Sequence, residues 1–455
     1  MACSSNIETL HGRVRLCRLS AYTGRLMPVD LAAVRSAWLN PPGAHAPWKT
    51  VWEPARLQGS FLPLTPVVLA NPRFFFRIAM TAVRDLVALA LRPRDFEKAV
   101  QPGDMVAALG AAWGVPGYAR RIAAAKRRYG IRFAVLVSDM IPIENGELVE
   151  RCHALQFRQW LNEIGPNADV ILTVSKYSRQ ALMQFAAAAG WPKPRIDVIR
   201  LGGEWSPRPG AHRAGRGADA KVDLPEHYVL FVSTIEIRKN HRLLVRVWRR
   251  LIERHGAGAV PVLVFAGQVG WMVDDLLADL AASDWLGGMI EHKPRLSDAA
   301  LTEAYDRCLF TVFPSLCEGW GLPVAESLAH GKFCLASNRT SIPEVGGDLI
   351  DYFDPADDDE AVGKIERLLF EPGHLAAREA RLCAKYRPGT RAAGTRASGT
   401  LAAGTWSDCA RSVVLKLERH AAIAHVLTDH ATTDGAATAG DPHERLASPQ
   451  PVGNP

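Results

Sequence analysis

The chain has 455 residues, of which 48% are hydrophobic and 22% charged, and its formal net charge is +7. This composition excludes a chain that is disordered throughout and a multispanning membrane protein, and the length predicts two domains and a tail. Up to Trp205 the chain carries 26 Lys and Arg against 15 Asp and Glu. A basic half of this kind fits an anionic partner or an ordinary solvated arginine-rich surface about equally well.

The cysteines, the first residues and an apolar region near the N-terminus narrow the class of protein further. The eight cysteines include no C-x-x-C pair, which argues against a zinc site or a disulfide framework. The opening residues "MACSSNIETLHGRVRL" lack the apolar core of a signal peptide. The apolar region at 61–93 is broken by Pro, Asn and Arg, so we expect no membrane span there. A cytoplasmic protein is therefore expected.

Short apolar runs predict buried strands in two series, each separated by segments of helical length. The first series lies at 105–110, 133–139, 168–175 and 196–202. The second series lies at 227–234, 260–267, 309–315 and 333–338. Alternating strands and helices favour parallel sheets, so the fold class is α/β with two Rossmann-like domains.

Changes in composition set the predicted domain boundaries. The stretch between the two series is rich in Pro, Gly and Arg and is predicted to be a linker, and a Gly-Thr quasi-repeat after Tyr386 has too little apolar bulk to pack. The resulting divisions are an N-terminal domain at 1–205, a linker at 206–220, a second domain at 221–385, a low-complexity insert at 386–405, a helix at 406–427 and a disordered tail at 428–455.

The stretch "PSLCEGWGLPVAESLAHGKF" (314–333) predicts a strand, a glycine-rich turn and a helix. Pro323 suits the first helical position and Gly331 suits the helix end. A helix that begins at the carboxyl edge of a parallel sheet presents free backbone N–H groups to a ligand.

Two acidic residues accompany this turn. Glu318 lies in the turn and Glu326 lies in the first helical turn or so, and we expect both to face one crevice. Carboxylates accept paired hydrogen bonds from vicinal hydroxyls, so two such acids beside an anion site describe a nucleotide sugar. The alternatives are a solvated loop residue for Glu318 and a helix N-terminal acid for Glu326.

A pair of cations follows the first strand of the second series. In "FVSTIEIRKNHRLLVRVW" (231–248), Arg238 and Lys239 precede an amphipathic helix. Fixed cations stabilise the negative charge that grows on a departing diphosphate in a transition state. The alternative is an exposed, charged helix start.

The segment "PSLCEGWGLPVAESLAHGKFCLASNRTSIPEVGGDLIDYFDP" (314–355) closely resembles the E-x7-E signature of the family 4 retaining glycosyltransferases of GT-B fold, and the likeness extends over 100–380. The resemblance implies two parallel-sheet domains that face a cleft. It implies that Glu326 binds the ribose of the donor and that Glu318 contacts the transferred sugar. It implies further donor contacts from the turn at Gly319, Gly321, Leu322 and Pro323, of which Gly321 and Leu322 offer backbone N–H groups.

The resemblance also assigns the cations and a segment of the first domain. It implies that Lys239 contacts the diphosphate, with Arg238 in place of the arginine that the family carries at the position of Thr234. The run "VLVSDMIPIENGELV" (135–149) resembles the "HDLIP" segment, which faces the donor sugar across the cleft. Here Ser138 replaces the usual His and Asp139 is kept.

Two more features of the family pattern bear on the first domain. The run "LTVSKYSRQALMQF" (172–185) resembles the "VS-x-x-S" segment, in which Ser175 and Ser178 are N-cap candidates. The family opens with a strand and a Gly-rich loop, which the first 30 residues do not show. The N-terminal domain is therefore predicted to lack its first strand.

A basic helix is predicted before the strand at 133–139, and it carries Tyr118, Ile122 and Tyr129 beside five cations. The cations are Arg120, Arg121, Lys126, Arg127 and Arg128. This face fits anionic lipid headgroups at the inner membrane and a solvated helix surface equally well.

These features together predict a retaining hexosyltransferase, with mannose as a candidate sugar and a lipid-linked oligosaccharide or surface polysaccharide as acceptor. The expected cosubstrate is a GDP- or UDP-hexose. No metal and no other cofactor are expected, since the acidic run "ADDDE" (356–360) is interpreted as a helix cap. The alternative is a catalytically inactive, nucleotide-sugar-binding partner subunit. Nucleic-acid binding is disfavoured because no aromatic-basic motif is present.

Overall fold

The computed structural model describes residues 17–19, 26–28, 100–110, 112–115, 117–203, 223–386 and 405–433. The apolar region at 61–93 and the predicted linker at 206–220 lie outside the described residues. So do 387–404 of the predicted insert and 434–455 of the predicted tail. Near the start of the chain, β1 (Cys17–Leu19) and β2 (Leu26–Pro28) pair antiparallel.

The first α/β unit spans 100–203 and contains a parallel sheet in the order β3-β4-β5-β6. Its strands are β3 (Met105–Ala108), β4 (Arg132–Leu136), β5 (Val170–Thr173) and β6 (Ile196–Val198). Its helices are α7 (Tyr118–Tyr129), α8 (Ile141–Glu144), α9 (Arg151–Ile164) and α10 (Lys176–Ala188), with short 3-10 turns η2 (Ala112–Gly114), η3 (Gly146–Leu148) and η4 (Gly165–Asn167). The period-two alternation of β4 sends Phe133 and Val135 to the face covered by α7, α9 and α10, and Ala134 to the opposite face.

The second α/β unit spans 223–386 and contains a six-stranded parallel sheet in the order β12-β11-β10-β7-β8-β9. Its strands are β7 (Tyr228–Val232), β8 (Val262–Ala266), β9 (Ile290–Lys293), β10 (Thr311–Phe313), β11 (Cys334–Ser337) and β12 (Asp351–Phe353). Its helical elements are η5 (Ile237–Lys239), α12 (His241–His255), α13 (Asp274–Ala282), α14 (Asp284–Gly287), α15 (Asp298–Arg307), α16 (Leu322–Ala329), α17 (Ile342–Gly346), α18 (Asp358–Phe370) and α19 (His374–Lys385).

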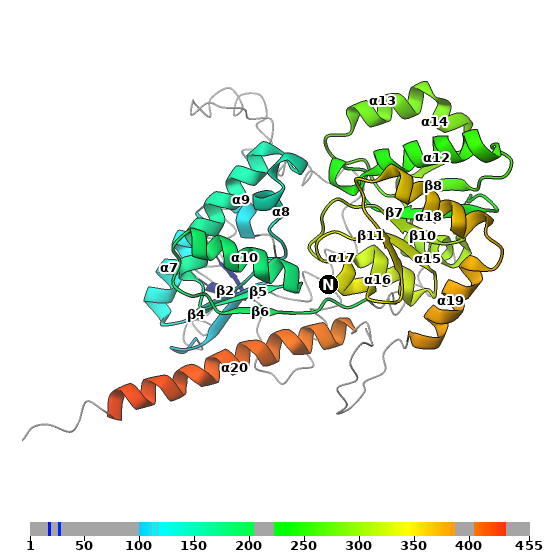
Figure 1. Ribbon diagram of the computed structural model, residues 1–455. Helices are drawn as coiled ribbons and strands as arrows, with labels where there is room; N and C mark the ends of the chain where they lie inside the picture. Colours follow the sequence, from blue (N-terminus) through cyan, green and yellow to red (C-terminus); the bar gives the residue numbers. More distant parts are fainter. Residues whose placement is uncertain are drawn as a thin grey trace, which may run out of the picture.

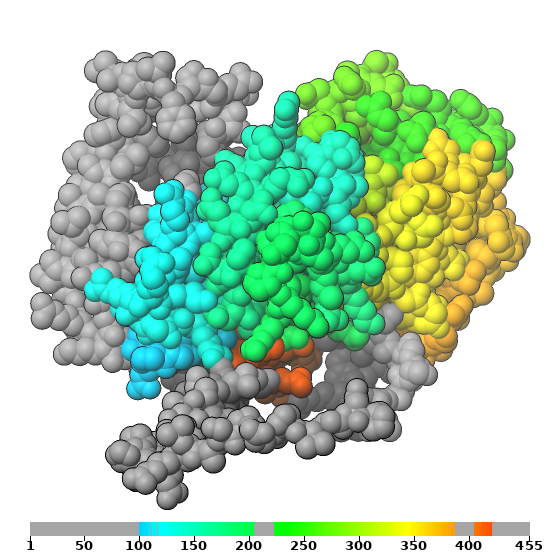
Figure 2. Space-filling model, turned by 60° about the vertical axis from the view of Figure 1, so that its left-hand side comes forward, coloured from blue at the N-terminus to red at the C-terminus, as the bar shows by residue number. Residues whose placement is uncertain are grey.

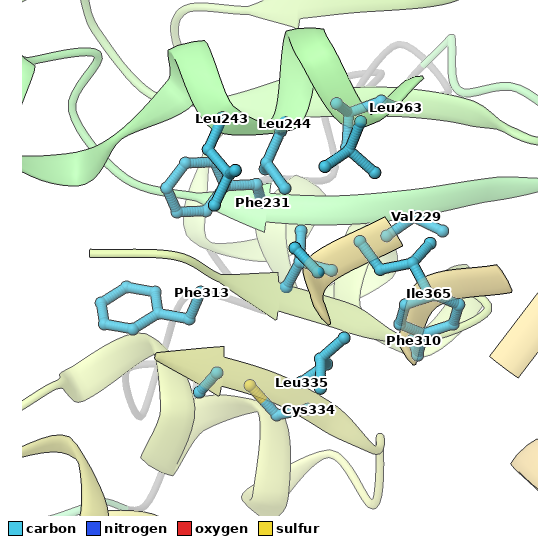
Figure 3. Packing of buried hydrophobic residues seen from close by; sticks show 14 of the residues in the cluster. Val229, Phe231, Leu243, Leu244, Leu263, Phe310, Phe313, Cys334, Leu335 and Ile365 are labelled. Carbon is cyan, nitrogen blue, oxygen red and sulfur yellow. The ribbon is translucent and has the colours of Figure 1, made fainter. Parts of the chain in front are cut away.

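The core of the second unit lies between this sheet and α12 (Figure 3). Phe231 and Leu263 project from the central strands toward Leu243 and Leu244 of α12, and all four side chains are fully buried. Burying a side chain of this size contributes roughly 1.5–3 kcal/mol. The central strands are therefore fixed in place, and the loops at their carboxyl ends lie on a rigid support.

The long helix α20 (Trp406–Thr433) returns from the second unit to the first and lies along the open face of its sheet (Figure 1). Its Val413 packs into the same cluster as Ala134 and Leu172. Arg132 of β4 donates a hydrogen bond to the carbonyl of His420 at 2.9 Å. The predicted helix at 406–427 is thus present and extends to Thr433.

The two units are in contact with one another, as the space-filling view shows for the cyan-to-green and yellow surfaces (Figure 2). Glu344 of α17 accepts hydrogen bonds from the backbone N–H groups of Lys176 and Tyr177, at 2.9 and 2.8 Å. These are the first residues of α10, so a carboxylate of the second unit lies at the positive end of a helix of the first. None of the described helices has the length and hydropathy needed to cross a membrane.

Candidate active site

The predicted strand, turn and helix are present as β10, a bend and α16. Gly321 has φ of 116°, a conformation that favours glycine, and it reverses the chain just before the helix. Leu322, and not Pro323 as predicted, is the first helical residue, and Pro323 is the second. The backbone N–H groups of Gly319, Gly321 and Leu322 donate no hydrogen bond to any residue that the structure describes. The bend therefore retains free donors at the carboxyl edge of the sheet.

Glu318, Arg238 and Lys239 form one buried cluster. One carboxylate oxygen of Glu318 lies 2.8 Å from a guanidinium nitrogen of Arg238, and the other lies 2.5 Å from the ammonium nitrogen of Lys239. Only 8% of Glu318 is exposed. The structure thus brings the predicted acid and both predicted cations together, although they are 79 or more residues apart in the chain.

Hydrogen bonds hold together the two loops that carry this cluster. Arg238 donates to the carbonyl of Cys317 at 2.8 Å and accepts, at its own carbonyl, the N–H of Leu316 at 2.9 Å. The hydroxyl of Ser341 donates to the carbonyls of Glu318 and Trp320, at 2.8 and 3.0 Å. The bend is therefore fixed on both sides.

A second buried carboxylate contacts Arg238. Glu236 is 2% exposed and lies 2.6 Å from the second terminal nitrogen of Arg238. Burial raises the pKa of Glu236 and outweighs the nearby cations Arg238 and Lys239. For Glu318 burial acts in the same direction, but Lys239 and Arg238 together outweigh it and lower the pKa. Glu318 is thus the carboxylate that stays ionised between the two cations.

The first unit contributes Asp139 and Ser138, which follow β4. A Cβ atom on Gly319 would lie 2.8 Å from the Cβ of Asp139 and 3.2 Å from the carbonyl oxygen of Ser138, so the close approach of the two units requires glycine there. Burial raises the pKa of Asp139, against the field of Arg238 and Lys239. Asp139 therefore lies beside the cluster, whereas the Ser138 side chain is exposed.

Glu326 contacts a different set of residues from Glu318. It is the fifth residue of α16, and its carboxylate accepts a hydrogen bond from the hydroxyl of Tyr305 at 2.9 Å. Burial raises its pKa, and the nearby charge that acts on it is His330 rather than Arg238 or Lys239. Glu326 is thus half-buried against Tyr305 of α15 and is not a member of the Glu318 cluster.

Two predicted helix caps are present, and the predicted basic helix differs in part from the expectation. Ser175 caps α10 by accepting the N–H of Ser178 at 3.0 Å, whereas Ser178 lies within the helix. Asp357 of the acidic run caps α18 by accepting the N–H of Glu360 at 2.9 Å, as interpreted. The basic face of α7 is smaller than expected, because Ile122 is buried and Lys126 forms an ion pair with Asp169 at 2.6 Å.

Three residues of the site region were not predicted from the sequence, namely Glu236, Tyr305 and Glu344, although each lies near a predicted feature. Glu236 stands two residues before Arg238, and an acid beside two buried cations is the available signal. Tyr305 and Glu344 offer no such signal, because their partners come from distant parts of the chain.

One group of potential metal ligands occurs among the described residues. Glu150, Cys152 and His153 lie at the start of α9, with ligand atoms within 4.8 Å of one another. None of the three belongs to the Glu318 cluster, and they are brought together because they lie within the first turn at the start of one helix.

Comparison with known proteins matches the part of the chain that carries this cluster. Residues 218–384 match the family model described as glycosyl transferases group 1. The O-antigen chain mannosyltransferase B of Escherichia coli is 33% identical over 202 residues, which are 44% of this chain and 51% of that protein. The serotype-specific mannosyltransferase WbdA of Escherichia coli is 27% identical over 251 residues, 54% of this chain and 30% of that protein. The chain therefore spans about half or less of the length of these relatives.

Solved structures agree on the fold. A trehalose-6-phosphate synthase studied with bisubstrate glycomimetics superposes with a TM-score of 0.53 at 13% identity, over 77% of this chain and 79% of that chain. A UDP-forming α,α-trehalose-phosphate synthase from Burkholderia xenovorans gives a TM-score of 0.50 at 13% identity, over 72% of this chain and 76% of that one.

The fold is thus α/β of the GT-B type, in which two parallel-sheet units face each other. Its second unit matches the glycosyl transferases group 1 family model, and the chain is similar to two mannosyltransferases over about half of its own length.

Proposed function

We propose that this chain is a hexosyltransferase that moves a sugar, with mannose as the first candidate, from a nucleotide-sugar donor to a saccharide acceptor. The observation that carries the proposal is the buried cluster of Glu318, Arg238 and Lys239 at the carboxyl edge of a parallel sheet. The position of the cluster within the matched domain and the mannosyltransferase relatives support it.

The donor diphosphate would lie beside Lys239 and Arg238 and accept hydrogen bonds from the free N–H groups of the bend. In the reaction the bond between the anomeric carbon and the phosphate oxygen breaks, and a bond to the acceptor oxygen forms. The acceptor hydroxyl loses its proton to the leaving phosphate, so the atoms and charges balance. The two cations stabilise the charge that develops on the diphosphate, and the anomeric configuration is retained.

Glu318 and Asp139 have distinct roles in this proposal. The charge of Glu318 holds both cations in place before the donor binds, and its remaining lone pairs can accept the hydroxyls of the transferred sugar. Asp139 faces the same space from the first unit, and burial raises its pKa. Ser138 and Glu326 remain predicted donor contacts, the latter to the ribose. The cytoplasm, with contact to the inner membrane, is the proposed location.

The test is donor turnover by the purified chain with GDP-mannose and with UDP-glucose, followed as release of nucleoside diphosphate with and without α-mannobiose. Wild type should turn over one donor, Glu318→Gln should reduce the rate about 100-fold or more, and Glu303→Gln, which removes an exposed carboxylate, should leave it unchanged. Donor binding by the wild type without turnover would refute the enzyme and support a nucleotide-sugar-binding subunit.

A further inference from the structure

A groove of about 1370 Å³ lies between the two units, beside the cluster described above. It is lined by α10 and β6 of the first unit, by the bend and α17 of the second, and by α20. Sites for single small molecules occupy roughly 300–1,000 Å³. The groove therefore has room for several linked sugars.

The cations of this groove have no ionic partner in the part of the chain that the structure describes. Three of its four cationic side chains come from the first unit, two from α10 and one from the loop after β6, and the fourth comes from α20. They are Lys176, Arg179, Arg200 and Lys416. None of these side chains forms an ion pair with any carboxylate that the structure describes. The first three residues are exposed, so their charges are available to a ligand.

The acids of the same groove are all engaged. Asp197 lies 2.7 Å from His420, and Asp348 lies 2.6 Å from Lys385. Glu344 accepts the two backbone N–H groups at the start of α10. The surface that remains for a ligand is thus positive, and it complements an anion.

One residue of the bend lines the groove. Trp320, which lines it, stands two residues after Glu318, and its ring packs against buried side chains of the first unit. Met183 of α10 is 45% exposed on another part of the lining. A sugar chain in this groove would have the exposed Met183 side chain for an apolar ring face and cations for its acidic groups.

We propose that this groove binds the acceptor and that the acceptor is an anionic saccharide, with carboxylate or phosphate groups on its sugars. The inference rests on the proposed function, and it specifies the acceptor class. Arg179 and Arg200 present their guanidinium groups to the anionic substituents, since guanidinium matches both carboxylate and phosphate.

The test is isothermal titration of the full chain with three tetrasaccharides, namely tetragalacturonate, a phosphorylated mannotetraose and neutral mannotetraose. At least one anionic ligand should bind about tenfold or more tightly than the neutral one, and the first two ligands distinguish a carboxylate from a phosphate preference. Arg179→Gln/Arg200→Gln should weaken that binding about tenfold or more. Arg151→Gln/Arg158→Gln is the matched control, because it removes two exposed arginines from α9 of the same unit.

Equal binding of all three ligands would overturn the proposal, and so would equal losses in the two double variants. Release of nucleoside diphosphate is measured on the same preparations. Groove-dependent binding without any donor turnover would contradict the proposed function alone. Donor turnover with a neutral acceptor, without groove-dependent binding, would contradict only the proposal that the groove binds an anionic acceptor.

Discussion

Replacing Glu318 by Gln should destabilise the protein and at the same time improve its binding of a nucleoside diphosphate. The substitution keeps the shape of the side chain but removes the charge that lies 2.8 Å from Arg238 and 2.5 Å from Lys239. Loss of one partner of a buried ion pair costs about 3–5 kcal/mol. Arg238 keeps Glu236 at 2.6 Å, so we expect the lower end, about 3 kcal/mol.

Urea denaturation with and without GDP or UDP measures both effects. The freed Lys239 should raise the affinity for the diphosphate about tenfold, or about 1.4 kcal/mol. Glu303→Gln is the control, since its pair with Arg307 at 2.8 Å is on the surface and is worth about 0–1 kcal/mol. The difference between wild type and Glu318→Gln should shrink as the pH falls below the ordinary carboxyl pKa of 4.5, because the folded pKa of Glu318 is lowered and its stabilisation is lost on protonation. A variant as stable as wild type at pH 7, or one with weaker diphosphate binding, would refute the reasoning.

Three further changes have defined outcomes. Burial lowers the pKa of His241 to about 3, so the unfolded chain binds the extra proton below pH 6.5 and wild type loses stability there. The free energy of unfolding of His241→Phe, measured by urea denaturation, should therefore rise by about 2–3 kcal/mol relative to that of wild type as the pH falls from 6.5 to 4.5. A difference between the two proteins that stays constant over this range would contradict the prediction. Glu344→Ala removes the carboxylate at the start of α10 and should loosen the contact between the units, seen as a larger radius of gyration in solution scattering; an unchanged radius would argue against that role. Ser175→Ala removes a helix cap and should lower the free energy of unfolding by about 1 kcal/mol, whereas no loss in calorimetry would show that the cap contributes little.

The repeating pattern of the sequence was sufficient to predict most of the fold. All eight predicted strands are present, and the strands inside the two sheets are the continuous apolar runs expected of buried strands. The strands β9 and β12 were missed, since "IEHK" and "DYF" carry polar residues that suit the edge of a sheet. The order of the strands confirms the expected parallel sheets in both units.

The site was predictable where its residues lie close together in the chain or follow a family pattern. Glu318, Arg238 and Lys239 were found in this way, and the structure brings them together. The partner of Glu326 could not be predicted, because Tyr305 reaches it from a neighbouring helix and no periodicity encodes that contact. A contact between elements depends on packing, which a single sequence does not display.

The central claim is that Lys239 and Arg238 bind the diphosphate of the donor. The most direct test compares the affinity of a nucleoside diphosphate with that of its monophosphate, in wild type and in Lys239→Gln. Wild type should prefer the diphosphate about tenfold or more, as expected for a charged hydrogen bond of about 1.5–3 kcal/mol, and the variant should lose most of that preference. The same preference in both proteins would contradict the claim.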